Sequence, residues 1–508
     1  MAVRAGKISL ALSGGIAALV LGTALALLTR AEGLSLRSAD LSALRFTVLQ
    51  AALSAGFSCA LAVPTARALM RRRFPGRGAL ILLMGAPFLL PVVVAVLGLL
   101  TIYGRSGLMN LLLAGIGLPP VTIYGLKGVV LAHVFFNLPL ATRMLLNGWH
   151  AIPAERFRLA ETLGLPSPFR HIELPMLRAV LPGAALAIFL VCLTSFVVAL
   201  TLGGGPAATT LELAIYQAVR FDFDLGRAAL LAALQFGLCA VAVLLAARLT
   251  LPLGLGAGQD RALAIRAPGG WRAGLDALIL AVAALFLILP LAAVVWDGLP
   301  ALVRLGAPVW QAALRSALMA LGSAALSVSA ALVLAQASAR GARVTELAAM
   351  LPMSASGLVM GTGLFLILRP LLRPEDVALP VTVLVNALMA LPFLYRLLLP
   401  EARALHADYD RLAQAVGLAG WARLRFLTLP RLARPLGLGA GIAAALAMGD
   451  LGVITLFAGE DQATLPLVVQ RLAGAYRMAE ASAAALLLVT LSFTLFALCD
   501  TGGRRAAP

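Results

Sequence analysis

Residues 159–165 read LAETLGL, and residues 412–418 read LAQAVGL. The two stretches lie about 254 residues apart, and other short pairs keep nearly that spacing. These pairs are Leu138-Pro139 with Arg143 and Leu391-Pro392 with Arg396, Leu174-Pro175 and Leu429-Pro430, and Ala208-Thr209-Thr210-Leu211 and Gln462-Ala463-Thr464-Leu465. Several pairs fall in polar segments, where chance similarity between apolar helices does not explain matching order and spacing. The repeat therefore predicts a duplicated fold.

The composition is that of a membrane protein. The chain has 508 residues, of which 61% are hydrophobic and 12% are charged, and its mean hydropathy is +0.99. Soluble domains are about half apolar and about a quarter charged, so a soluble enzyme and a disordered chain are excluded. Twelve apolar runs could each cross about 30 Å of hydrocarbon as a helix. They lie near residues 8–29, 44–66, 79–102, 126–148, 179–202, 226–249, 274–296, 310–337, 346–368, 378–400, 432–457 and 480–500. Since the alternation of barrel strands is missing, we predict an all-α polytopic protein with about twelve transmembrane helices.

The charge distribution predicts the orientation. The net charge is +18, from 40 Lys and Arg against 22 Asp and Glu. Most of the cations fall in segments that are cytoplasmic when both termini are cytoplasmic, as the positive-inside rule requires. Arg71–Arg73 is interpreted as such an anchor, with an anionic-lipid site as the alternative. No basic cluster with interleaved aromatic residues is present, so no nucleic-acid partner is expected.

The duplication predicts two halves of six spans each. We assign residues 1–250 to the first repeat, 251–273 to a cytoplasmic linker and 274–508 to the second repeat. Because six is even, the copies have parallel topology and are related by an axis along the membrane normal. Halves that tilt about such an axis give alternating access, so the arrangement favours transport over membrane enzymology.

The longest polar cytoplasmic segments, 149–178 and 401–431, occupy the same place in each half. Each begins with a helix-compatible stretch, 150–164 or 405–417, that a glycine ends. Each loop is therefore predicted to project a short amphipathic helix. Two such helices at matched positions favour paired contact surfaces for a two-fold partner over solvent-exposed helices without a binding role.

These loops resemble the "EAA" loop of the membrane subunits of binding-protein-dependent ATP-binding-cassette (ABC) importers. The pattern is an alanine, a glycine four residues later and a Leu-Pro about a dozen residues further on. It matches at Ala160, Gly164 and Pro175, and again at Ala413, Gly417 and Pro430. The resemblance implies a type I ABC importer permease fold, in which each loop forms a coupling helix that docks into a groove of an ATPase subunit.

The loops depart from that pattern in two ways. Arg158 and Arg411 stand where the family has a leading glutamate, which affects an expected salt bridge to the ATPase. The first loop, from Gly164 to Pro175, is also two residues shorter than the second, from Gly417 to Pro430.

A finer resemblance is to the thiamine and thiamine pyrophosphate permeases, within a branch that also contains fused iron(III) permeases. It rests on residues 202–218, LGGGPAATTLELAIYQA, on 136–143, FNLPLATR, and on 102–105, IYGR. Independently, the glycines and proline at 203–206 predict a helix break at the outer surface, followed by a short interfacial helix over 211–219. The stretch is either a structural turn or a gate and docking surface for a periplasmic solute-binding protein. The candidate residues are Gly204, Pro206, Glu212 and Tyr216.

The chain carries no nucleotide-binding motif of its own. Its two lysines, Lys7 and Lys127, lack the Gly-Lys-Ser/Thr context of a phosphate-binding loop. No metal-ligand pattern appears either. We therefore expect a transport subunit without catalytic residues, metal or cofactor, with ATP used by two partner ATPase subunits and substrate delivered by a periplasmic thiamine-type binding protein. The expected location is the bacterial inner membrane.

Polar groups inside the spans mark the candidate translocation path. Asp450, flanked by Gly449 and Gly452, is predicted to lie well inside the eleventh span. Because a carboxylate costs about 2.5–3.5 kcal/mol there, it is either satisfied by a neighbouring helix or lines the path of a cation such as thiamine. Asn137 and Asn386 are further candidates, near the possible hinges at Pro139 and Pro392.

Three alternatives remain beside a thiamine ABC permease. An iron(III) permease would share the architecture. A proton- or sodium-coupled carrier would need a relay within the spans, for which Asp450 alone is thin support, and it leaves the paired loops unexplained. His133, within a span, is interpreted as hydrogen-bonded between helices rather than as a proton relay. A membrane enzyme lacks a nucleophile and base. Two fused halves favour one copy of the chain per ATPase pair over two copies.

Overall fold

The computed structural model describes residues 2–31, 36–85, 89–164, 169–205, 208–248, 269–459 and 461–507. Within these ranges the chain is helical and contains no strand. Eleven helices are long and apolar enough to cross a membrane, or twelve when one bent pair counts as a span. The prediction of an all-α polytopic membrane protein is confirmed.

The helices form two sets in the same order. The first set is α1 (Ala2–Arg30), α2 (Ser38–Arg71), α3 (Arg77–Leu83), α4 (Val92–Tyr103), α5 (Leu108–Gly115), α6 (Leu126–His150), α7 (Ala154–Thr162), α8 (Leu174–Leu193), α9 (Val197–Leu202), α10 (Leu211–Arg220) and α11 (Leu225–Arg248). The second set is α12 (Trp271–Gly298), α13 (Ala307–Ala339), α14 (Arg343–Met350), α15 (Gly357–Leu368), α16 (Ala378–Ala415), α17 (Gly420–Arg423), α18 (Leu429–Met448), α19 (Gly452–Phe457), α20 (Leu465–Gly474) and α21 (Met478–Ala506).

Matching helices repeat in length and in contacts. Helices α8 and α18 have 20 residues each, and α9 and α19 have six each. The first backbone N–H of α10, at Leu211, donates to Thr47 Oγ1 at 2.9 Å. The first N–H of α20, at Leu465, donates to Ser316 Oγ at 2.8 Å. The same capping contact is therefore made twice. The predicted linker falls mostly on residues 249–268, outside the described residues, so the domain boundaries stay a prediction.

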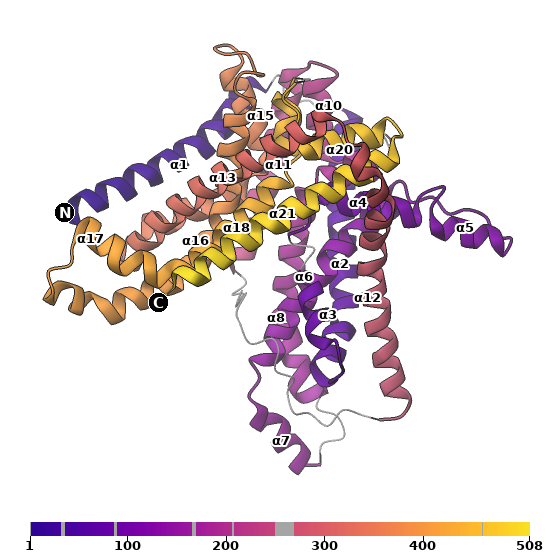
Figure 1. Cartoon of the computed structure of the whole chain (residues 1–508), viewed down its shortest axis with the longest axis horizontal. Helices are drawn as coiled ribbons and strands as arrows, with labels where there is room; N and C mark the ends of the chain where they lie inside the picture. Colours follow the sequence, from indigo (N-terminus) through magenta and orange to yellow (C-terminus); the bar gives the residue numbers. More distant parts are fainter. Residues whose placement is uncertain are drawn as a thin grey trace.

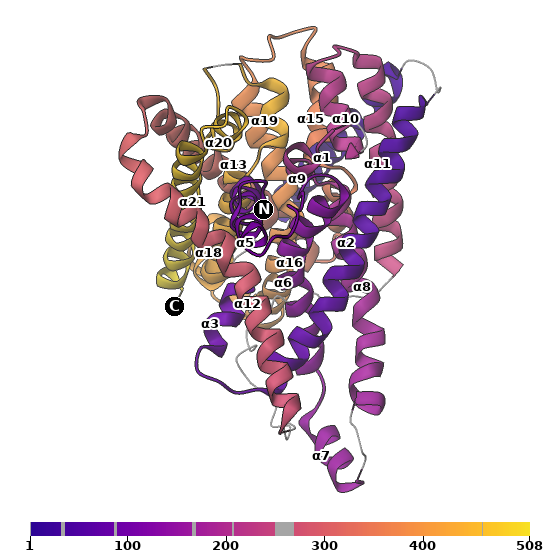
Figure 2. The ribbon, with the colours of Figure 1, turned by 90° about the vertical axis from the view of Figure 1, so that its right-hand side faces the viewer.

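The first helix of each set packs on helices of the other set. Helix α1 contacts α13, α14 and α15, as well as α11. Helix α12 contacts α2 and α4, as well as α21. Figure 2 shows α12 beside α21. At Gly98 in α4 the approach to α12 is so close that a Cβ would lie 2.3 Å from the carbonyl oxygen of Pro290. A glycine without a side chain makes this crossing possible.

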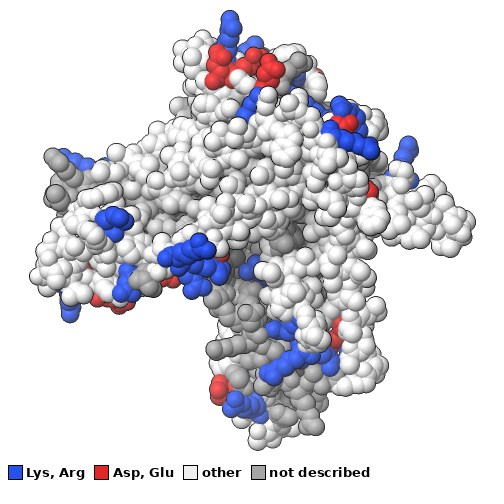
Figure 3. Space-filling model, viewed as in Figure 1, with Lys and Arg blue, Asp and Glu red and all other residues white. Residues whose placement is uncertain are grey.

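Figure 1 shows two groups of helices that diverge from a common end. Helices α10, α15 and α20 lie at that end, and α7 and α17 lie at the tips of different groups. In Figure 3 most of the Lys, Arg, Asp and Glu side chains on the face shown gather toward the ends of the molecule, and the described surface between them is largely uncharged. Such an uncharged belt is what a hydrocarbon layer requires.

Four predicted spans are not single helices. The run 79–102 divides into α3 and α4, and Pro91 stands immediately before α4. The run 346–368 is bent by 93° between α14 and α15, next to Pro352. The runs 179–202 and 432–457 are interrupted at residues 194–196 and 449–451. Proline accounts for the first two breaks because it lacks an N–H and clashes with the preceding turn. Gly449 marks the fourth, and nothing in the sequence marks the third.

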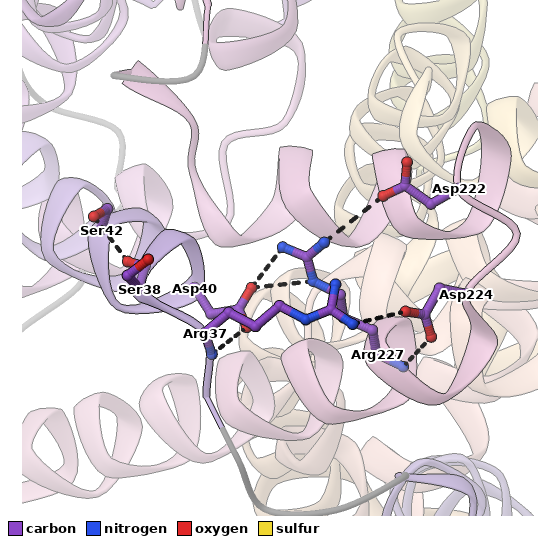
Figure 4. A network of polar contacts seen from close by, with 7 residues as sticks. All are labelled: Arg37, Ser38, Asp40, Ser42, Asp222, Asp224 and Arg227. Carbon is purple, nitrogen blue, oxygen red and sulfur yellow. Dashed lines mark hydrogen bonds and ion pairs between the residues drawn. The ribbon is translucent and has the colours of Figure 1, made fainter.

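Buried ion pairs connect distant segments. Arg227 of α11 donates to Asp40 Oδ1 from Nη2 at 2.7 Å and from Nε at 3.1 Å (Figure 4). Asp40 also accepts the backbone N–H of Arg37 at 2.9 Å, so it caps α2. Asp224 and Asp222 extend the network to Arg37 and Arg227 at 3.5 and 3.7 Å. This network fixes the start of α2 on α11.

A second buried carboxylate, Asp276 of α12, is 2% exposed. It accepts hydrogen bonds from Arg71 Nη2 at 2.7 Å and from Arg72 Nε at 2.8 Å. Two members of the Arg71–Arg73 triplet therefore hold α12 against α2, a role that the interpretation as a topology anchor did not include. Which side of the membrane each terminus faces stays a prediction.

Candidate coupling and translocation sites

The first polar loop contains α7, separated from α6 by residues 151–153. Ala160 is 5% exposed, and Gly164 has φ +62° just beyond the helix. Pro175 occupies the first turn of α8, where its missing N–H leaves no helical hydrogen bond unmade. Each residue of this motif therefore has a definite backbone or packing role.

In the second loop α16 runs without interruption from the tenth predicted span to Ala415. The expected separate helix at 405–417 is thus the continuation of the span, and Pro400 lies inside it. Ala413 is 2% exposed, Gly417 has φ +67°, and Pro430 occupies the first turn of α18. The two loops share their motif geometry and differ in how rigidly they join the span.

Both glycines end their helices in the left-handed conformation. The N–H of Leu418 donates to the Ala413 carbonyl at 2.8 Å, and that of Gly417 donates to Gln414 at 3.1 Å. These are the bonds of a glycine-terminated helix end.

Replacing Gly417 by alanine should loosen this helix end. A Cβ at Gly417 meets no atom within 4 Å, so the cost is backbone strain alone, about 1–2 kcal/mol. We expect faster hydrogen exchange in a peptide covering 413–418. The control is Gly474→Ala, which also meets nothing within 4 Å but has no positive φ. Equal exchange in Gly417→Ala and the wild type would contradict the assignment.

Each loop presents two exposed apolar side chains at matching positions. Leu159 and Leu163 are 59% and 66% exposed, and Leu412 and Val416 are 59% and 66% exposed. Arg158 and Arg411 stand beside them and are also exposed. In the second loop Asp410 is bonded to His406 Nδ1 at 2.8 Å and to Arg423. The arrangement is that of an apolar contact surface with a basic border.

Two broken spans lie at equivalent positions, between α8 and α9 and between α18 and α19. Asp450 is located in the second break, between Gly449 and Gly452. Its carboxylate faces the backbone amides of Gly452, Val453 and Ile454 at the start of α19 and the side chain of Asn386. Backbone amides at a helix start stabilise a negative charge. Discontinuous helices at membrane depth are typical of transporter binding sites.

The two candidate asparagines have different surroundings. Asn137 is 2% exposed and donates from Nδ2 to the His133 carbonyl at 2.8 Å and to Cys192 Sγ at 3.4 Å. It therefore bonds within α6 and to α8 rather than to Asp450. Asn386 lies beside Asp450 and is 8% exposed. His133 is hydrogen-bonded through Nδ1 to Ser54 Oγ of α2 at 3.2 Å, as expected for an interhelical contact.

The candidate periplasmic residues surround α10. Gly204 has φ +74°, and a Cβ there would lie 2.9 Å from Tyr124 Cβ. Pro206 lies outside the described residues. Glu212 is fully buried and accepts from Gln235 Nε2 at 3.2 Å. Tyr216 is half-buried and packs edge-to-face on Phe196 at 5.2 Å.

Helix α10 is not a surface helix, which corrects the expectation of an interfacial one. It packs against α2, α11, α15 and α19, and seven of its residues are buried: Leu211, Glu212, Leu213, Ala214, Ile215, Ala218 and Val219. Thr210 caps it by accepting the N–H of Leu213 at 3.3 Å. The helix therefore joins the two sets at the end where they meet.

The doubled helix sets, the paired apolar loops and the two broken spans define a membrane permease. No protein-family model matches the chain. It is 40% identical over 480 residues to a thiamine transport system permease protein of Salmonella typhimurium, covering 90% of this chain and 88% of the relative. It is 41% identical to that of Escherichia coli over the same shares, and 40% identical over 470 residues to that of Brucella abortus, covering 90% and 86%. The chain belongs to the family of thiamine transport system permease proteins.

Proposed function

We propose that this chain is the membrane-spanning permease of an ABC importer that carries thiamine or its phosphates from the periplasm into the cytoplasm. The similarity to thiamine permeases over nine-tenths of the chain carries the proposal. The protein is thus a multi-pass component of a bacterial inner membrane, with both termini cytoplasmic.

The paired loops supply the coupling to ATP. Two separate ATPase subunits dock on the apolar surfaces around Leu159 and Leu412, so one copy of the chain serves one ATPase pair. When ATP binding draws these subunits together, the loops approach each other. Because each loop is continuous with or adjacent to a long helix, α6 or α16, its movement tilts the helices behind it. The tips on which α7 and α17 lie then close, and the opposite end opens (Figure 1).

The periplasmic end receives the substrate from a solute-binding protein. Helix α10 and the turn before it lie where the two helix sets meet, so a protein bound there senses their separation. In the sequence, each broken span follows the helix at a cytoplasmic tip, α7 or α17, and precedes the helix at the periplasmic end, α10 or α20. Asp450 supplies a negative charge for a cationic substrate on that path.

The test is transport by the reconstituted complex. The chain is placed in proteoliposomes with its ATPase and its binding protein, and uptake of labelled thiamine is measured with ATP and with ADP. We expect uptake that requires ATP and both partners. Iron(III) uptake in place of thiamine, or thiamine uptake driven by an ion gradient without the ATPase, would contradict the proposal.

A further inference from the structure

The two broken spans approach each other across the boundary between the helix sets. A Cβ added to Gly452 would lie 3.8 Å from Asp450 Oδ1 and 3.9 Å from Phe196 Cδ1. Phe196 belongs to the break at 194–196, and Asp450 belongs to the break at 449–451. One small residue therefore has the acid of one break and the aromatic ring of the other as neighbours.

Polar atoms at this junction are not fully hydrogen-bonded. Asp450 Oδ2 and Asn386 Nδ2 are both buried, and neither makes a hydrogen bond of normal geometry among the described residues, although the two side chains lie close enough to interact. An unpaired buried polar atom costs about 1–3 kcal/mol, and buried groups in native proteins are normally satisfied. Two such atoms on side chains that face each other indicate a place where a polar ligand completes the hydrogen bonding.

Aromatic rings flank the same junction. Phe196 and Tyr216 meet edge-to-face at 5.2 Å, and Tyr216 meets Phe221 at 5.7 Å. Aromatic faces attract cations and stack against planar rings. Tyr216 is only half-buried. The junction thus combines a carboxylate, an amide and aromatic surface.

Among the described residues no Lys or Arg forms an ion pair with Asp450, whose carboxylate interacts with backbone amides and with Asn386. Arg220 and Arg471 lie close enough to Tyr216 to interact electrostatically with its hydroxyl group. Their Nη2 atoms donate at 3.5 Å to the carbonyls of Ala458 and Gly459, beyond the C-terminal end of α19. Asp450 lies at the N-terminal end of that helix, which is about 9 Å long at 1.5 Å per residue. Positive and negative side chains are therefore separated along α19.

We propose that Asp450, Asn386, Phe196 and Tyr216 form a binding site for a planar aromatic cation within the membrane part of the permease. The site rests on the proposed function, since the thiazolium ring of thiamine is such a cation. Asp450 pairs with the positive ring, Asn386 donates to a ring substituent, and the two aromatic rings pack against its face. The site uses residues from both helix sets, so tilting of the halves reshapes it.

The central test separates charge from structure. Asparagine caps a helix start about as well as aspartate, so Asp450→Asn keeps the contact with α19 and removes the charge. We measure the KM for ATP-dependent uptake of thiamine, and of a neutral isostere with thiophene in place of thiazolium, by the full importer. The expected result is at least a tenfold rise in KM for thiamine and little change for the isostere. Asp450→Glu, which keeps the charge, should recover part of the affinity.

The contribution of the Tyr216 ring is tested with Tyr216→Leu and Tyr216→Phe. The leucine variant should raise the KM for both compounds several-fold, and the phenylalanine variant should resemble the wild type. Unfolding temperatures of the purified permeases establish that each variant is folded. An equal loss for thiamine and isostere in Asp450→Asn, or an unchanged KM in both Asp450→Asn and Tyr216→Leu, would overturn the site. In either case the proposed function stands as long as the wild-type importer takes up thiamine.

Discussion

Aspartate at both Leu159 and Leu412 will reduce ATP-dependent uptake to the background of a system without ATPase, while the permease stays folded. Both leucines are 59% exposed in this chain and lie at the same position of the two loops. An apolar anchor buried in a partner's groove contributes about 2 kcal/mol or more, so losing one weakens docking at least about 30-fold. An aspartate in that groove adds an unpaired buried charge. We therefore expect each single variant to be strongly impaired and the double variant to be inactive.

The matched control is Gln414→Asp, which introduces the same charge at an exposed polar position two residues from Leu412. It should retain most of the uptake. Co-purification of the ATPase with each variant measures docking directly, and the unfolding temperature of the permease checks its fold. Normal uptake by the double variant would show that these loops are not the ATPase contact.

Alanine at Asp276 will strongly destabilise the permease. Its carboxylate is 3% exposed and pairs with both Arg71 and Arg72, whose side chains are 18% and 19% exposed. Removing one partner of a buried ion pair leaves uncompensated charge and costs about 3–5 kcal/mol. We expect a clear fall in the unfolding temperature of the detergent-solubilised protein.

Asp276→Asn should be milder, because the amide oxygen still accepts one of the two hydrogen bonds. Asp376→Ala, at an exposed acid, should leave the unfolding temperature within error of the wild type. If Asp276→Ala unfolded at the same temperature as Asp376→Ala, the contact between α2 and α12 would not depend on this carboxylate.

The long helices are predictable from the sequence because their cause is local. A run of about 20 apolar residues must form a helix in lipid, where only internal hydrogen bonds satisfy the backbone. The helix ends at Gly164 and Gly417 are predictable for a similar reason. The left-handed backbone conformation at a helix end favours glycine, so the residue type alone indicates where the helix stops.

The breaks in the membrane spans and the contacts between distant polar side chains have causes that are not local, so the sequence does not define them. The break at 194–196 has neither proline nor glycine, so its cause lies in packing against neighbouring helices. Asp276 meets Arg71 and Arg72 from about 200 residues away, and no periodicity encodes that contact. Asp450 and Asn386 come together for the same reason, although each could be selected singly as a polar residue in an apolar run.

The crossed packing of α1 and α12 has a consequence for biosynthesis. Chains are made from the N-terminus, and domains generally fold as they emerge. Helix α1 is translated well before its neighbours α13, α14 and α15, which follow more than 270 residues later. Until these helices are synthesised, the face of α1 that later packs on them contacts lipid. The nascent N-terminal portion therefore completes its packing only after most of the polypeptide has been inserted.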